Sequence, residues 1–303
     1  MIDLTCGLDP RALDAIAALE ARTVAADGGR LKLEWGALRA RAGDRVDDVL
    51  WWSGDRLLGF LGLYAHDGRN VELAGMVDPA ARRQGIASAL LDAALPLCRE
   101  RAHEKILLVT PRASHAGRQL ALARGAVLEH SEYALVLPGA PNDEAAGPEL
   151  TFRTAEAADL PEVARLQHVA FGFPAEDGAM HLVTETARTL VIEVTGAIVG
   201  TLRVTREGDA GGIYGFAVDP AQQGRGIGRE VLRRVCRDLR AEGMQRVGLE
   251  VAVQNERALG LYTSVGFVPV TTEDYYELPP RLTLLLAAGA VARDVLRDAV
   301  RRA

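Results

Sequence analysis

Residues 218–228 read VDPAQQGRGIG, and residues 77–87 read VDPAARRQGIA in the same order. The Val, the Pro and the central Gly of the second stretch each lie 141 positions after their counterparts in the first. A repeat of this period in a chain of 303 residues is the size of one ordinary domain. The chain is therefore predicted to be a tandem duplication.

The composition is that of a soluble globular protein, with 49% hydrophobic and 25% charged residues. The formal net charge of −6 gives no general attraction for nucleic acid or for an acidic membrane surface, and suits a basic substrate better. Three cysteines, Cys6, Cys98 and Cys236, have no spacing typical of disulfides or of zinc. No segment reads as a signal peptide or a membrane span. We therefore expect a cytoplasmic protein without a metal, and no nucleic-acid or membrane partner.

The repeat and the composition of its junction set the expected domain limits. Residues 138–148 are rich in Pro, Gly and acidic side chains, as in exposed linkers. We predict a first domain at 1–140, a linker at 141–150, a second domain at 151–280 and a C-terminal helical tail at 281–303. Apolar residues on one side of the tail and arginines on the other predict a packing or dimerising helix. The protein is expected to be a monomer with an internal pseudo-dimer, or a homodimer.

Local patterns predict the same order of elements in both halves. In the second half, a strand at 151 and a helix from 159 precede a hairpin at 190–204 and a strand at 213–218. A helix at 226–242, a strand at 247–253, a helix at 256–265 and two closing strands at 267–278 follow. The first half repeats this order, with its hairpin at 49–64, a strand at 71–77, a helix at 85–101, a strand at 106–110 and a helix at 116–124.

The turn at 218–228 has the features of a phosphate site. Pro220 ends a strand, and glycines at 224, 226 and 228 remove side chains where a backbone must approach a ligand. Consecutive N–H groups at the positive end of a helix then favour a pyrophosphate. The spacing is neither that of a P-loop nor that of a dinucleotide-binding motif. The alternative is a tight turn without a ligand.

A second set of residues follows this turn: Leu249-Glu250-Val251, then Asn255, Leu261-Tyr262 and Gly266-Phe267. In this order and spacing, the turn and this set resemble the Gcn5-related N-acetyltransferase (GNAT) family, and through the repeat the resemblance covers nearly all of residues 1–280. Within the family, the second half is most similar to the ribosomal-protein alanine N-acetyltransferases. The two-domain architecture is similar to that of the mycothiol synthases.

The resemblance implies an α/β fold in which each of two tandem domains has a mixed, splayed sheet. It also implies an enzyme that transfers acetyl from acetyl-CoA to a primary amine, with acetyl-CoA wedged between diverging strands of the second domain. The implied cofactor-binding residues are Ala217, Val218, Gln223, Gly224, Arg225, Gly226, Ile227, Gly228, Arg229 and Asn255. The Ala217 and Val218 backbone would pair with pantetheine, and the turn would hold the pyrophosphate.

Two side chains are candidates for the chemistry. Aminolysis of a thioester needs a neutral amine, so a base must accept a proton, and Glu250 is our candidate. Tyr262 would protonate the departing thiolate, and the Val218 N–H would stabilise the tetrahedral oxyanion. Each has an alternative: Glu250 as a partner for a basic group or for the substrate amine, Tyr262 as a core aromatic, and Asn255 as a helix N-cap.

The first half keeps the turn but not this chemistry. Moving back 141 positions, Glu250 corresponds to Val109, Asn255 to Ser114 and Tyr262 to Ala121. We therefore expect a degenerate first domain. A possible second CoA site comprises Val77, Arg82, Arg83, Gln84, Gly85 and Ala87, and the alternative is a turn kept only for packing. Glu72 lacks an accompanying acid, and at least one of Trp51 and Trp52 is expected to be buried.

The sequence does not identify the acceptor. It is expected to be a small-molecule or peptide amine bound near 168–190 and 205–212, a region where His168 and His181 are more simply solvated or capping residues. One alternative is the cysteinyl pseudodisaccharide acceptor of the mycothiol synthases. Another is a CoA-binding sensor or interaction module without catalysis.

Overall fold

The computed structural model describes residues 1–41, 43–65, 69–142, 147–172 and 187–279. The described strands form one mixed sheet of twelve strands, in the order β1-β2-β3-β4-β5-β12-β6-β11-β10-β9-β8-β7. His181 and the expected tail at 281–303 lie outside the described residues. The expected domain limits stay a prediction.

The first half contributes six strands and four helices to this described part. In chain order they are β1 (Ile2–Thr5), α1 (Pro10–Asp27), α2 (Trp35–Arg39), β2 (Asp48–Ser53), β3 (Arg56–Tyr64), β4 (Asn70–Val77), α3 (Ile86–Glu100), β5 (Lys105–Pro111), α4 (His115–Ala123) and β6 (Val127–Leu137). A 3₁₀ turn at Pro79–Ala81 joins β4 to α3.

The second half repeats this pattern from β7 onward. Its described elements are β7 (Thr151–Thr154), α5 (Leu160–Phe171), β8 (Ala187–Val194), β9 (Ala197–Glu207), β10 (Ala210–Val218), α6 (Ile227–Ala241), β11 (Arg246–Ala252), α7 (Glu256–Val265) and β12 (Val268–Glu277). A single long strand, β12, takes the place of the two closing strands expected at 267–278.

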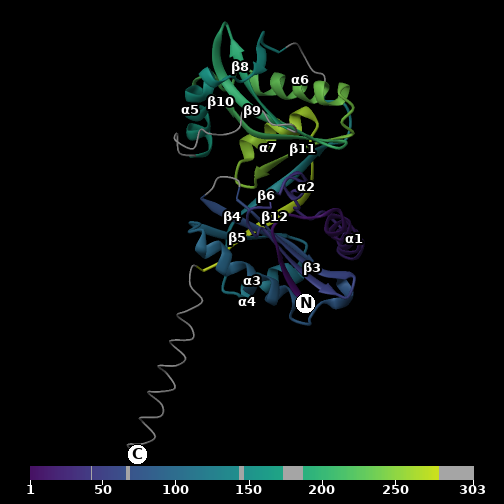
Figure 1. Cartoon of the computed structure of the whole chain (residues 1–303). Coiled ribbons are helices and arrows are strands. Elements are labelled where there is room, and N and C mark those ends of the chain that lie inside the picture. The colour runs from purple at the N-terminus through teal and green to yellow at the C-terminus, as the bar shows by residue number, and fades with distance from the viewer. Residues whose placement is uncertain (42, 66–68, 143–146, 173–186, 280–303) are drawn as a thin grey trace, which may run out of the picture.

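The two halves exchange their last strands. β12, from the second half, pairs antiparallel with β5 of the first, with Tyr275 opposite Val109. β6, from the first half, pairs antiparallel with β11 of the second, with Glu250 opposite Ala134. β6 and β12 also pair with each other at the centre of the sheet (Figure 1). Each half-sheet is thus completed by the other half, which makes the pseudo-dimer one continuous structure.

The cores follow the same exchange. The core beneath α3 and α4 includes Tyr276 and Leu278 from the other half, and the core beneath α6 and α7 includes Leu135 and Leu137 of β6. A separate cluster lies under α1 and α2 on the opposite face of the first half, and α5 covers the opposite face of the second. Both faces of each half are therefore covered by helices, as mixed and parallel sheets require (Figure 1).

Two pairs of parallel strands separate at their carboxyl ends. β10 pairs with β11 only from Ala210↔Arg246 to Ile213↔Leu249, although both strands continue. An irregularity in β10 after Tyr214 coincides with Gly215, whose φ of 53° departs from extended backbone. In the first half, β4 and β5 likewise stop pairing at Ala74↔Val109. Each half therefore has diverging strands directly before its turn.

Candidate active site

The turn that precedes α6 presents its backbone at the surface. Gly226 caps the helix in the left-handed conformation, with φ 80° and ψ −4°, and Gly224 has φ 79°. Residues 223–226 are exposed, whereas the Ile227 side chain lies in the core. The carbonyl of Val218 accepts a hydrogen bond of 2.9 Å from the Gln223 amide. The start of α6 therefore offers backbone N–H groups to an anion from outside the molecule.

Three further residues predicted for the cofactor have structural contacts. A Cβ on Gly228 would lie 3.1 Å from Leu261, so this glycine lets α6 approach α7 closely. Arg229 donates to Ser264 Oγ at 3.1 Å, and Arg225 donates to the Gln222 amide oxygen at 2.5 Å. Both guanidinium groups lie on exposed residues of the turn. Ala217 is buried at the end of β10, beside the separation from β11.

The first-half turn has the same backbone conformation as the second. Gly85 caps α3 with φ 82° and ψ −1°, and Arg82 has φ −67° and ψ 160° where Gln223 has φ −69° and ψ 161°. Arg82 donates to the Val77 carbonyl at 3.2 Å, as Gln223 does to that of Val218. Its guanidinium also binds Asp27 through two hydrogen bonds of 2.8 and 2.6 Å.

The rest of the possible second site is exposed at this turn. Gln84 and Arg83 lie at the surface, and Ala87 is half-buried in the first turn of α3. Arg83 has φ 65°, a left-handed conformation that costs a non-glycine residue about 1–2 kcal/mol. The backbone conformation of the second-half turn is thus preserved in the first half.

α7 carries two predicted residues of the second-half site. Asn255 caps the helix, and its side chain accepts from the Ala258 N–H at 3.0 Å, which is the capping geometry considered from sequence. Tyr262 is 8% exposed, and its ring meets Phe267 edge-on at 6.3 Å between centroids. Burial raises the pKa of Tyr262 to about 12. The phenol therefore carries its proton at every physiological pH.

Glu250 is held by two cations from the first half. Lys32 Nζ lies 3.0 Å from its carboxylate, and Arg30 donates a hydrogen bond to it. Burial alone would raise the pKa of Glu250, but Lys32 and Arg30 outweigh burial and lower it. Lys32 and Arg30 lie between α1 and α2, so the first half reaches the predicted site of the second.

Lys32 also contacts groups that the sequence analysis did not select. Its ammonium lies 3.4 Å from Glu72 and 3.8 Å from Glu132, and it donates to the Tyr275 hydroxyl. The Tyr275 hydroxyl in turn donates to Glu132 at 2.8 Å. The sequence repeat could have identified two residues of this region, because Glu132 and Glu273 lie one repeat period, 141 positions, apart.

Glu273 completes the group. It lies opposite Glu132 in the sheet and is 1% exposed, and neither of its carboxylate oxygens has a hydrogen-bond partner among the described residues. Burial raises its pKa to about 7, despite the nearby charges of Arg30 and Lys32. We refer to Glu72, Glu132, Glu250 and Glu273 as the central carboxylates.

The first half has no equivalent of the predicted catalytic pair. Ala121 and Val109, the counterparts of Tyr262 and Glu250, are buried apolar residues. Trp51 packs against the core beneath α3 and Trp52 against the cluster under α1, so the two indoles lie on opposite faces. Each is half-buried, so neither is buried as fully as expected. Within the described part of the chain, no group of His, Cys, Asp or Glu is arranged to hold a metal ion.

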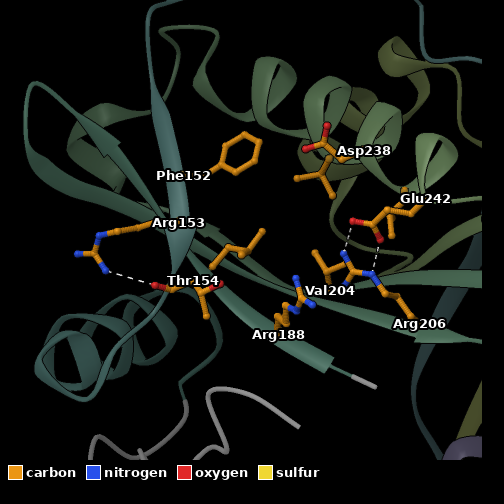
Figure 2. Close-up of a pocket in the computed structure, with 11 residues that line it drawn as sticks. Phe152, Arg153, Thr154, Arg188, Val204, Arg206, Asp238 and Glu242 are labelled. Carbon is orange, nitrogen blue, oxygen red and sulfur yellow. Dashed lines mark hydrogen bonds and ion pairs between the residues drawn. The ribbon is translucent and has the colours of Figure 1, made fainter. Parts of the chain in front are cut away.

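A cavity of about 250 Å³ lies apart from these residues, between β7–β9 and the end of α6 (Figure 2). Its lining includes Phe152, Arg188 and Asp238, and an ion pair between Arg206 and Glu242 closes one side. None of the predicted site residues lines it. Of the helices that the structure describes, none is both long and apolar enough to cross a bilayer.

Comparisons with known proteins agree with this geometry. The model of the acetyltransferase (GNAT) family matches residues 22–125 and 160–267, once in each half. The mycothiol acetyltransferase of Beutenbergia cavernae is 34% identical over 237 residues, which cover 70% of this chain and 77% of that protein. That of Kytococcus sedentarius is 30% identical over 296 residues, which cover 90% of this chain and 96% of that protein.

Solved structures show the same fold. A GCN5-related N-acetyltransferase from Sphaerobacter thermophilus matches with a TM-score of 0.76 at 20% identity, over 93% of this chain and 96% of its own. A tandem GNAT protein from the clavulanic acid biosynthesis pathway matches with a TM-score of 0.67 at 20% identity, over 93% and 99%. The duplicated turns, the diverging strands and these matches lead to one conclusion: the chain is an N-acetyltransferase of the GNAT family, with two GNAT domains in tandem.

Proposed function

We propose that the second half carries the working site, which transfers acetyl from acetyl-CoA to a primary amine. The observation that supports this most is the placement of Tyr262 on the helix packed behind the turn at 223–229, beside strands that stop pairing at Ile213↔Leu249. The pyrophosphate would bind this turn, and pantetheine would lie along Ala217 and Val218, near Asn255. The first half has Ala121 and Val109 at the positions that correspond to Tyr262 and Glu250.

The reaction that we propose is direct attack. The neutral amine forms a C–N bond to the thioester carbonyl, and the oxyanion of the tetrahedral intermediate is stabilised by the Val218 N–H. The C–S bond then breaks, and the thiolate takes the proton of Tyr262. Before the attack, Glu250 takes one proton from the acceptor ammonium, directly or through water. After the attack, the nitrogen gives its next proton to the Tyr262 phenolate, which restores the phenol. Because Arg30 and Lys32 lower its pKa, Glu250 is ionised at neutral pH and serves equally as the counter-charge of the arriving ammonium.

Tyr262→Phe tests this assignment. It should lower kcat by about 100-fold or more, because protonation of a leaving group is typically worth that much, with little change in the affinity for acetyl-CoA. CoA release against a panel of amines measures kcat, and calorimetry measures acetyl-CoA binding. A variant with full kcat, or one that loses only acetyl-CoA affinity, contradicts the role. Thr263→Val, the adjacent change on α7, is the matched control.

A second candidate for the acceptor comes from the relatives. Because the mycothiol acetyltransferases match over most of this chain, a cysteinyl pseudodisaccharide acceptor is a specific possibility. Its inclusion in the amine panel tests it: a kcat/KM well above that of simple amines supports it, and no turnover excludes it. Tight acetyl-CoA binding with no turnover of any amine would favour the non-catalytic sensor.

The setting that we propose is the cytoplasm. Cys98 and Cys236 are buried thiols, Cys6 is exposed, and none of the three is in a disulfide. Burial raises the pKa of Cys98 to about 11 and that of Cys236 to about 12, so both are unreactive at neutral pH. Free thiols and an acidic net charge suit a reducing compartment and a basic small-molecule partner rather than a polyanion.

A further inference from the structure

The central carboxylates lie on one face of the sheet although they come from four strands. Alternate residues of a strand share a face, and so do residues opposite each other on neighbouring strands. Glu132 lies opposite both Glu273 on β12 and Ala252 on β11, which puts Glu250 on this face. Tyr275 lies opposite Val109, and Leu107 lies opposite Glu72, which puts Glu72 there too.

Solvent reaches this face at its centre. The side chains of Glu132 and Glu72 are 26% and 22% exposed. Tyr214 is 42% exposed on the same face of β10, and it interacts electrostatically with Glu250. A ligand can therefore contact the central carboxylates and an aromatic ring together, beside the point where β10 and β11 separate.

The charges on this face do not balance. Four central carboxylates meet two permanent cations, Arg30 and Lys32, and the imidazole of His130 lies 3.9 Å from Glu132. Lys32 is shared by three of the four. Glu250 also pairs with Arg30, whereas Glu72 and Glu132 share Lys32 as their lysine or arginine partner. Glu273, which is buried beside Glu132, has no hydrogen-bond partner among the described residues. A buried carboxylate without a partner is costly, and one further cation near Glu132 would relieve it.

We infer that the acceptor carries two cationic nitrogens, and that Glu132 and Glu273, together with Glu72, bind the one that is not acetylated. The inference rests on the proposed function, because it places the reacting amine at the thioester beside Glu250. β12, β6 and β11 are neighbours, so Glu273 lies about 10 Å from β11 across two strand spacings. A diamine with a spacer of six or more carbons fits this span. The reacting nitrogen loses its proton, and the second stays an ammonium.

Three acceptors of equal length test the inference: 1,6-diaminohexane, hexylamine and 6-aminohexanoate. Each has a primary amine at one end, and the other end is an ammonium, a methyl and a carboxylate, respectively. With the intact enzyme, kcat/KM should be about tenfold or more higher for the diamine than for hexylamine, and lowest for 6-aminohexanoate. Equal kcat/KM values for the three, or a preference for hexylamine, overturn the inference.

Variants identify the residues. Glu132→Gln should lower the diamine-to-hexylamine ratio at least fivefold, and Glu273→Gln should lower it in the same direction. Glu129→Gln is the matched control, because Glu129 is on the same strand but pairs with Lys105 at 2.8 Å, outside the central carboxylates. An unchanged ratio in both variants overturns the assignment. Melting temperatures establish that each variant is folded.

Failure of the proposed function has a different signature, the absence of CoA release with all three amines. Calorimetric titration of 1,6-diaminohexane and hexylamine into the full-length protein then tests the inference without turnover. Tighter binding of the diamine, weakened by Glu132→Gln, supports it. Equal affinities, or no binding of the diamine, overturn it.

Discussion

Lys32 is a residue of the first half that contacts Glu250 and Tyr275 of the second half as well as two carboxylates of its own half. Its side chain is 9% exposed, and its nearest carboxylate is that of Glu250. Arg30 contacts the same carboxylate from the same segment. A carboxylate with two cations stays ionised at lower pH than one without. The pKa of Glu250 is therefore set in part by residues of the first half.

Lys32→Met should shift the acid limb of the kcat/KM profile to higher pH. Lys32 lowers the pKa of Glu250, so its removal raises that pKa, and the ionised form appears later as pH rises. Lys32→Arg should restore most of the original profile. Lys105→Met, which removes an exposed ion pair with Glu129, is the control and should leave the profile in place. A profile that does not move in Lys32→Met contradicts this role.

Glu273→Gln should stabilise the protein increasingly as pH rises. The pKa of Glu273 is raised from 4.5 in the unfolded chain to about 7, so the folded protein favours the protonated carboxyl group over the carboxylate. The contribution of the protonated Glu273 side chain to the stability of the fold is fully present below pH 4.5 and is lost as pH rises through about 7. Glutamine stays neutral, so the gain above pH 7 is on the order of 2–3 kcal/mol. Melting temperatures at pH 5 and pH 8 measure this, and a gain that shrinks with pH contradicts it.

The two turns are the elements that survive duplication most completely. Their capping glycines, Gly85 and Gly226, differ by only a few degrees in φ and ψ. Arg83 adopts a left-handed conformation where the second half has Gly224. The left-handed conformation is unfavourable for an arginine. The surrounding turn, and not the preference of the residue alone, therefore determines the conformation of Arg83.

Gly226→Val should lower the affinity for acetyl-CoA at least tenfold. Its φ of 80° is unfavourable for a β-branched residue, and the change distorts the N–H groups that start α6. Gly85→Val makes the same change in the first half and reports whether that turn binds CoA. Gly54→Val, at a hairpin turn with φ 58°, is the control for backbone strain alone. Binding is measured by calorimetry, and unchanged affinity in Gly226→Val contradicts the cofactor site.

The sequence predicted the duplication, most elements and the turns, because each depends on a local pattern. Tyr262 came from the family resemblance, and its catalytic role stays a prediction. Pro220 and the glycines that follow it fix the turn, and apolar periodicity fixes the helices. It singled out Glu250 and considered Glu72, but it did not predict that the central carboxylates lie together, since their proximity depends on which strands pair. Nor did it predict Arg30 and Lys32, which lie between helices in a segment without periodicity. The exchange of β6 and β12 was not predicted for the same reason. The pattern of a single strand does not specify whether it pairs within its own half or with the other half.

At the scale of the whole molecule, the exchange makes each half depend on the other. β5 has no partner on its outer side without β12, and β11 has none without β6. Both cores also contain side chains from the exchanged strands. The first half is therefore required for the structure of the second, in addition to supplying Arg30 and Lys32.

Thermal unfolding should be a single transition in spite of the two domains. Separating the halves removes β6 and β12 from their cores and exposes two strand edges, so neither half is stable after the other melts. Calorimetry measures this through agreement of the calorimetric and van't Hoff enthalpies. Two resolved transitions would contradict the dependence. Arg39→Met, which removes an exposed ion pair to Glu207 in the other half, should leave a single transition.

The exchange of strands also has a consequence for synthesis on the ribosome. β5 is made early, but β12 follows it by more than half the length of the chain, which takes about 10–30 s at 5–20 residues per second. During that time the nascent first half carries an open, apolar strand edge that can pair with another chain. Truncated products that end before β12 should therefore aggregate, and the growing chain should depend on chaperones until its last strand emerges.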